Sequence, residues 1–170
     1  MDHLSTKRRW WLITRGLLRA AVTAALMVVL YYLLPLTSRS HTYIGIEFAL
    51  GLVVLVGAMT WEVRAIMRAK YPAIRAPQAL ATIVPLFLLV FASTYFILSS
   101  EDPTAFSEPL SRSDALYFTI TVFSTVGFGD INPLDENVRL LVGSQMLLDL
   151  IVLGVGIKVI LGAVQRGRDS

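Results

Sequence analysis

The sequence predicts an all-α membrane protein with four transmembrane helices, and with a re-entrant helix and a loop between the third and fourth of them. The first observation is composition: 55% of the 170 residues are hydrophobic and 16% are charged, a balance typical of membrane proteins. The second is that apolar residues form four stretches, each long enough to cross a bilayer as a helix: 17–36, 44–63, 79–98 and 138–164. The third is the placement of basic residues between these stretches.

The basic residues alternate from one side of the predicted bundle to the other. They gather before the first stretch, between the second and third, and after the fourth: Lys7, Arg8, Arg9, Arg15, Arg19, Arg64, Arg68, Lys70, Arg75, Arg166 and Arg168. Such residues resist translocation and mark the cytoplasmic side. We therefore expect a multi-pass protein of the cell membrane (plasma or bacterial inner membrane) with both termini in the cytoplasm. Stretch 17–36 is longer than the apolar region of a cleaved signal peptide, so we expect it to be retained.

Several classes of function are excluded because the sequence lacks the residue types or clusters that they need. It has no cysteine, which excludes disulfides and thiolate metal sites. His3 and His41 lie far apart, so we predict no metal site built on them. The basic residues flank apolar segments instead of forming a stripe, which argues against a nucleic-acid partner. No nucleophile and base are clustered, so we do not expect an enzyme.

The segment between the third and fourth stretches is the most informative. Residues 113–123 have the pattern of a helix that is too short to cross a bilayer, so we predict a re-entrant helix. Ser113 is the expected N-cap, and Asp114 is favourable in the first turn. This helix leads into Ser124-Thr125-Val126-Gly127-Phe128-Gly129-Asp130.

Two glycines that flank one aromatic residue allow an unusual backbone. Gly127 and Gly129 tolerate positive φ angles, so a strand that alternates ordinary and glycine-type conformations can turn successive carbonyl groups to one side. Several such strands around an axis would form rings of oxygens able to replace the hydration shell of a cation. Non-helical backbone at membrane depth is tolerated only where it lines a cavity. The alternative, an ordinary external loop with glycines, does not explain the flanking helices.

Residues 114–161 resemble the pore region of tetrameric K⁺ channels, and with the third stretch they resemble the two-helix pore domain of that superfamily. The resemblance covers about half of the chain. It implies that the carbonyl groups of Thr125, Val126, Gly127 and Phe128, together with the Thr125 hydroxyl, coordinate K⁺ in a selectivity filter. It also implies that Gly127 and Gly129 permit the strand geometry, that the chain forms a homotetramer, and that permeant K⁺ is needed but no organic cofactor.

The same resemblance assigns supporting roles around the filter. Phe128 stands where many members have tyrosine, and phenylalanine also occurs in K⁺-selective members. Tyr117 is at a position where many members carry an aromatic donor, and we expect it to hydrogen-bond Asp130. Thr121 replaces an acid of some bacterial members, so their carboxylate pairing is not expected. Ser124 completes the expected support.

An acid lies in the middle of the fourth stretch. Asp149 shares a predicted helix face with Gln145, Leu153 and Gly156, and it stands near the glycine hinge of many K⁺ channels; Gly154 and Gly156 are alternative points of flexing. A charge at bilayer centre is costly and should face water or a partner. We expect four copies of Asp149 to ring the cavity below the filter, where they would concentrate K⁺ and favour block by Mg²⁺ or polyamines. A structural hydrogen bond to a neighbouring helix is the alternative.

The predicted organisation is a two-helix transmembrane region with a cytoplasmic linker (1–78), a pore domain (79–165) and a short cytoplasmic tail (166–170). A loop at 37–43 is too short for a second pore loop, so we reject the two-pore-domain arrangement. Arg64, Arg68, Lys70 and Arg75 lack the three-residue spacing of a voltage sensor, and we predict none. A carrier subunit and a non-conducting membrane interaction protein are the remaining alternatives, and the sequence does not say whether a separate regulatory subunit binds.

Overall fold

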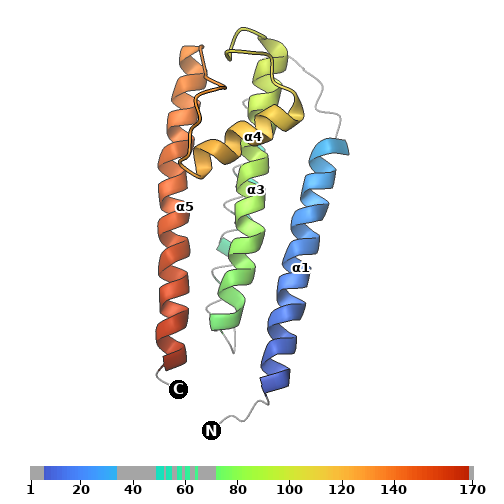
Figure 1. Cartoon of the computed structure of the whole chain (residues 1–170), viewed down its shortest axis with the longest axis vertical. Coiled ribbons are helices and arrows are strands. Elements are labelled where there is room, and N and C mark those ends of the chain that lie inside the picture. Colours follow the sequence, from blue (N-terminus) through green and yellow to red (C-terminus); the bar gives the residue numbers. More distant parts are fainter. Residues whose placement is uncertain are drawn as a thin grey trace.

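The computed structural model describes residues 6–33, 49–51, 53–54, 57–58, 60–61, 64 and 72–168. Its named elements are α1 (Thr6–Leu33), α3 (Pro72–Glu101), α4 (Arg112–Phe123) and α5 (Glu136–Arg168). Helices α1, α3 and α5 run along the long axis of the molecule, and α4 lies across one end of them (Figure 1). In the described residues the rest of the backbone is loop, with one isolated bridge between Phe106 and Pro133.

Three of the described helices contain segments that are long and apolar enough to cross a membrane. These segments are Thr14–Leu33, Ala79–Glu101 and Glu136–Lys158, so the first, third and fourth predicted stretches are indeed helical. The second stretch, 44–63, lies largely outside the described residues, and those described within it are helical. One of them, Gly51, lies against Val90 of α3, where an added Cβ would stand 3.0 Å from Val90 Cγ1.

Helix α3 begins earlier than the sequence indicated. We expected a cytoplasmic linker as far as residue 78, but the helix begins at Pro72. Proline is well suited to the first position of a helix, where its missing N–H would have had no partner and its fixed φ fits the helix. Residues 72–78, which we assigned to the linker, are therefore helical.

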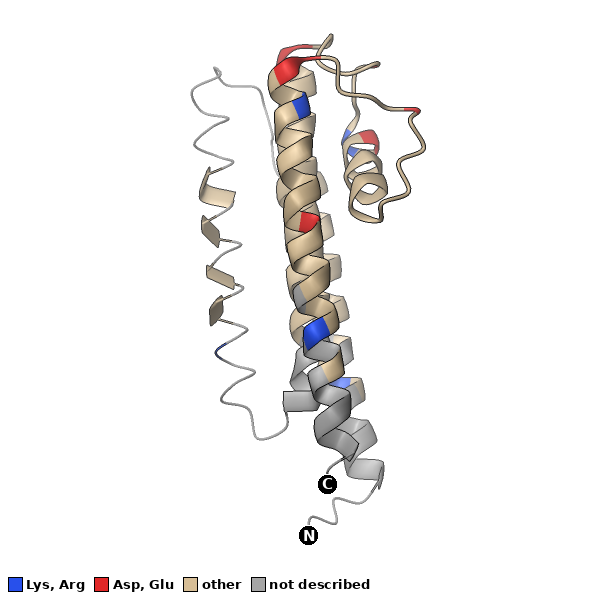
Figure 2. Cartoon of the chain, turned by 90° about the vertical axis from the view of Figure 1, so that its left-hand side faces the viewer, with Lys and Arg blue, Asp and Glu red and all other residues tan. Residues whose placement is uncertain are grey.

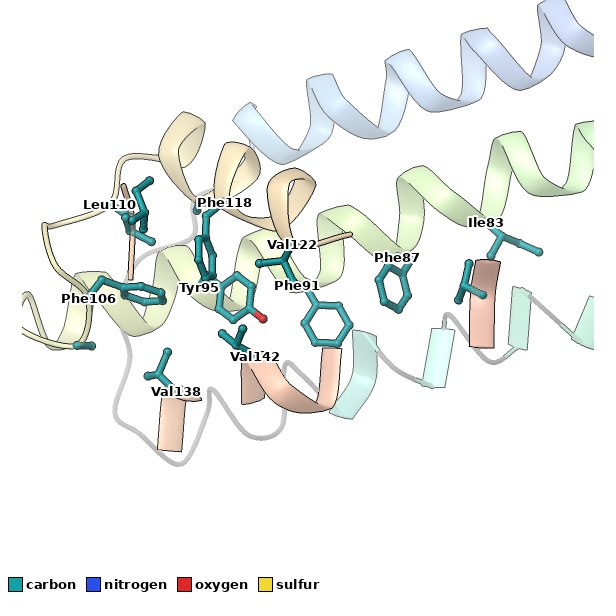
Figure 3. Packing of buried hydrophobic residues seen from close by; sticks show 14 of the residues in the cluster. Ile83, Phe87, Phe91, Tyr95, Phe106, Leu110, Phe118, Val122, Val138 and Val142 are labelled. Carbon is teal, nitrogen blue, oxygen red and sulfur yellow. The ribbon is translucent and has the colours of Figure 1, made fainter. Parts of the chain in front are cut away.

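Aromatic packing fixes α4 at one end of the bundle. Tyr95 of α3 is fully buried, and its ring centroid lies 5.3 Å from that of Phe118 on α4 and 5.9 Å from that of Phe106 in the preceding loop. Both pairs are edge-to-face, the arrangement that the aromatic quadrupole favours. Figure 3 shows these rings together with Val138 and Val142 of α5. One cluster of buried side chains therefore joins α3, α4 and α5.

The N-terminus of α4 is capped two residues earlier than predicted. Ser111 is the N-cap: its side chain accepts from the Asp114 amide at 3.2 Å, and its own amide donates to Asp114 Oδ2 at 2.9 Å. This is a reciprocal capping box, and the bonds from the Ser111 side chain and then its backbone lower the pKa of Asp114. The prediction that Ser113 caps this helix is wrong, because Ser111 and not Ser113 stands three residues before an acid.

Helix α1 packs along α3 and reaches the start of α4. Tyr31 Oη donates to the Arg112 carbonyl at 2.8 Å, and the Arg112 guanidinium donates to the Tyr31 carbonyl. The hydroxyl groups of Tyr32 and Ser113 are 3.0 Å apart. The Arg112 guanidinium also lies 5.1 Å from the ring centroid of Phe96 on α3. The end of α1 is thus tied to the beginning of α4.

Candidate functional site

The loop after α4 has an alternating backbone conformation. Thr125, Gly127 and Gly129 have φ angles of +59°, +51° and +78°, while Val126 and Phe128 between them are not in the positive-φ region. An added Cβ at Gly127 or Gly129 would meet nothing within 4 Å, so the backbone conformation, not space, requires glycine there. The sequence predicted the two glycine conformations but not that of Thr125. A β-branched residue with positive φ is rare, and such strain concentrates at functional sites.

Four successive carbonyl groups of this loop have no hydrogen-bond partner among the described residues. Among the described residues, no hydrogen bond is made to the carbonyl oxygen of Thr125, Val126, Gly127 or Phe128. In contrast, the Gly129 carbonyl accepts from Asn132 Nδ2 at 2.7 Å. Residues 125–128 are exposed in one subunit, so these four carbonyl oxygens are available to water, an ion or another subunit.

The inner end of the loop is anchored on the last turn of α4. The Thr121 carbonyl accepts from the amides of Val126 and Gly127 at 3.1 and 3.2 Å, and from the Ser124 hydroxyl at 3.3 Å. The Thr121 side chain is buried and its hydroxyl donates to the Phe118 carbonyl at 2.8 Å. Thr121 thus holds the loop through its backbone carbonyl, and the Ser124 hydroxyl donates to the same carbonyl.

The outer end is held by an aromatic side chain and a carboxylate. Tyr117 Oη donates to Asp130 Oδ2 at 2.7 Å, the contact that the sequence predicted. This bond raises the pKa of Tyr117 and lowers that of Asp130. The rings of Tyr117 and Phe128 are stacked, with centroids 6.4 Å apart and an interplanar angle of 3°. The Tyr117 side chain of α4 therefore contacts the loop at two residues, Phe128 and Asp130.

A second anchor at the outer end was not found from the sequence. Ser107 donates its amide to the Asn132 carbonyl at 2.8 Å, and its hydroxyl accepts from the Asn132 amide at 3.0 Å. These bonds join the loop before α4 to the loop after it. No motif signals this pairing, because a serine and an asparagine in two polar loops are common. Figure 2 shows acidic residues concentrated at this end of the molecule.

The acid in α5 lies inside the subunit. Asp149 is 1% exposed and Gln145 is 0% exposed. Gln145 Nε2 is 3.5 Å from Asp149 Oδ2 and 3.4 Å from the Thr119 carbonyl oxygen of α4, and Tyr95 Oη donates to Gln145 Oε1 at 2.7 Å. A residue that lines a cavity between subunits would be exposed in one isolated subunit. The burial of Asp149 in one subunit does not favour the predicted cavity ring, which stays a prediction. Its one printed contact is to Gln145 of the same helix, so the alternative of a hydrogen bond to a neighbouring helix is not shown either.

The other α5 positions singled out from the sequence are divided between two faces. Gly156 is buried, and an added Cβ there would lie 3.3 Å from Leu80 Cδ2 of α3. Leu153 is 38% exposed and Gly154 is exposed. We expected Leu153 to share a helix face with Gln145 and Asp149, but it does not lie on their buried face. The helix continues unbroken through both glycines.

Comparison with known proteins agrees with this geometry. Residues 83–166 match a protein family described as ion channel. The chain is also similar to the voltage-gated potassium channel Kch of Escherichia coli strain K12, with 29% identity over 154 residues that cover 89% of this chain and 36% of that protein. The chain thus spans little more than a third of the length of this relative. No solved structure matches the chain.

The match to the ion channel family and the membrane-spanning segments support a non-enzymatic membrane channel domain. Within that class, both comparisons support the potassium channel superfamily as the one that the chain resembles.

Proposed function

We propose that this chain conducts K⁺ passively through a homotetrameric pore, with Thr125, Val126, Gly127 and Phe128 coordinating the ion. The four carbonyl groups without a hydrogen-bond partner in the described residues carry this proposal. A ring of such oxygens replaces the hydration shell of K⁺. One subunit supplies one strand, so several copies are needed to close a ring, and four is the number that the resemblance implies.

The position of α4 supports the same proposal. At 12 residues it is about 18 Å long, too short to cross a hydrocarbon core of about 30 Å, and it is best explained as a re-entrant pore helix. Its C-terminus precedes Thr125 directly, so the negative end of the helix dipole favours a cation at the inner end of the filter. We assign 79–165 to the pore domain, 1–78 to a peripheral region with two transmembrane helices, and 166–170 to a cytoplasmic tail.

The roles of Gly154 and Gly156 in gating remain proposals, as does the orientation with both termini in the cytoplasm. The printed name of the relative describes that protein as voltage-gated. For this chain we propose no voltage sensor, because the basic residues between the second and third apolar stretches lack the regular spacing that a sensor needs. Of these residues, Arg64 is described and exposed, and Arg75 lies in the first turn of α3.

Bilayer recording of the purified protein tests the proposal. Under bi-ionic K⁺/Na⁺ conditions the reversal potential should favour K⁺ strongly, and the conductance should not rise steeply with voltage. Gly129→Ala should abolish K⁺-selective current, because alanine is strained at a φ of +78°. Gly57→Ala is the matched control, since Gly57 is exposed and has open space around it.

Two results would refute the proposal: a reversal potential with no preference for K⁺, or equal currents from Gly129→Ala and the wild type. Proteoliposomes without any K⁺ flux would favour the non-conducting alternative. Saturable transport coupled to a second solute would favour a carrier. Mass measurement of the solubilised complex should give four subunits.

A further inference from the structure

A polar network crosses the middle of the subunit behind the proposed filter. Tyr95 of α3 donates to Gln145 of α5, and the Gln145 amide nitrogen lies between the Thr119 carbonyl of α4 and the carboxylate of Asp149. Tyr95, Thr119, Gln145 and Asp149 are all fully or almost fully buried. The proposed conduction path uses none of these four side chains.

Asp149 is the unsatisfied member of this network. Its Oδ2 has one long contact, 3.5 Å from Gln145 Nε2. Its Oδ1 is buried and has no hydrogen-bond partner. An ionised carboxylate needs several donors or a cation when it is removed from water. In the described residues this carboxylate has neither.

Among the described residues, the elements packed against Asp149 supply no compensating charge. Helix α3 has no Asp, Glu, Lys, Arg or His between residues 79 and 100, and its Tyr95 hydroxyl is used by Gln145. The charged residues of α4, Arg112 and Asp114, lie at its far end and are held there by Tyr31 and Ser111. On α5, Lys158 is exposed, and nine residues place it about 13 Å further along the helix.

We propose that Asp149 is a proton-binding site, and that the bound proton keeps α5 seated against α3 and α4. With the proton on Oδ1 the buried group is a neutral carboxylic acid, so one polar atom lacks a partner but no unpaired charge is buried. Loss of the proton creates a buried carboxylate with no counter-ion, and the group gains hydration only if α5 rotates or separates from its neighbours. Proton binding by Asp149 is independent of the proposed function. The effect of this proton on ion conduction rests on the proposed function.

Infrared difference spectroscopy detects the proton directly. A spectrum of wild type minus Asp149→Asn at pH 6 should contain the carbonyl stretch of a protonated carboxylic acid. Ordinary aspartates, with pKa values of about 3.9, are ionised at that pH. The band should disappear as the pH is raised. In the control, wild type minus Glu108→Gln, an exposed side chain is changed instead, and the Asp149 band should cancel because both proteins keep Asp149.

Conductance then tests the coupling to α5. Open probability of the wild type and of Glu108→Gln should change at least about fivefold between pH 6 and pH 9, the lower end of usual coupling factors. Asp149→Asn, which is neutral throughout and close in shape, should change less than about twofold. An infrared difference spectrum without the protonated band at pH 6 overturns the proton site. A band together with conductance that is equally pH-dependent in wild type and Asp149→Asn overturns the coupling.

These outcomes are separable from failure of the proposed function. If the purified protein passes no ions, the conduction proposal falls, and the infrared band still decides whether Asp149 binds a proton. In that case the pH dependence of hydrogen exchange along α5 replaces conductance as the measure of coupling. Exchange should increase with pH in the wild type and not in Asp149→Asn, and equal profiles would refute the coupling.

Discussion

Tyr95→Phe removes one hydroxyl from the centre of the bundle and leaves the aromatic ring in place. The ring contacts with Phe91, Phe106 and Phe118, at centroid distances of 6.1, 5.9 and 5.3 Å, should persist because phenylalanine has the same ring. The lost interaction is the 2.7 Å bond from Tyr95 Oη to Gln145 Oε1. The substitution therefore isolates a single buried hydrogen bond between α3 and α5.

The magnitude follows from the burial of both partners. Tyr95 and Gln145 are each 0% exposed, so water does not replace the lost donor, and leaving a buried acceptor unsatisfied costs about 1–3 kcal/mol. Polar contacts between membrane helices average about 0.6 kcal/mol and reach about 1.7 kcal/mol. The short distance and complete burial place this bond in the upper part of that range. We expect Tyr95→Phe to lower the free energy of unfolding by about 1–2 kcal/mol.

Reversible unfolding in lipid bicelles, followed by steric trapping, measures this loss. Thr94→Val is the matched control on the same helix, because the Thr94 hydroxyl donates only to the Val90 carbonyl of its own helix, at 2.8 Å. Its removal leaves the backbone ladder intact, and we expect a change below about 0.5 kcal/mol. If Tyr95→Phe is no less stable than Thr94→Val, the Tyr95–Gln145 bond does not stabilise the packing of α3 against α5.

Two further predictions concern the ends of α4. Tyr117→Phe should destabilise the outer end of the loop and speed the decay of K⁺ current. The control Tyr32→Phe also loses an exposed hydroxyl contact but should leave the decay unchanged. Equal decay rates in the two variants would contradict the bracing role of the Tyr117–Asp130 bond. The Asp130 pKa is depressed from its ordinary value of 3.8 and the Tyr117 pKa is raised from 10.0. The bond is therefore fully present between these two values, and it is lost only as the pH falls through the lower Asp130 pKa or rises through the higher Tyr117 pKa. Ser111→Ala should lower the free energy of unfolding by about 1 kcal/mol through loss of the N-cap, and Ser113→Ala by less; the reverse order would restore Ser113 as the cap.

The sequence was sufficient for the elements whose signal is local. Apolar length located three of the spanning helices, and the pair of glycines in Gly127-Phe128-Gly129 predicted positive φ angles at both. The Tyr117–Asp130 contact was found because both residues belong to one compact motif. In contrast, the N-cap of α4 had two candidates, Ser111 and Ser113, which are only two residues apart. Only the spacing to Asp114, three residues after Ser111, identifies Ser111 as the cap.

Contacts between distant segments could not be read in this way. The face of α5 that carries Gln145 and Asp149 could point toward a water-filled cavity or toward polar groups of another helix, since either satisfies an acid in a membrane. The partner of Gln145 on α3, Tyr95, is 50 residues away in the chain and has no motif around it. The same holds for Ser107 and Asn132, which join two loops across the whole of α4.

The reciprocal bonds between Tyr31 and Arg112 have a consequence for biosynthesis. These residues are 81 positions apart, so α1 is complete long before its partner on α4 exists. At about 5–20 residues per second, translation needs roughly 4–16 s to cover that interval. During this time Tyr31 has no Arg112 to bond, so these two bonds can form only after α4 is made. The end of α1 is thus the earlier-made half of a contact that the later helix completes.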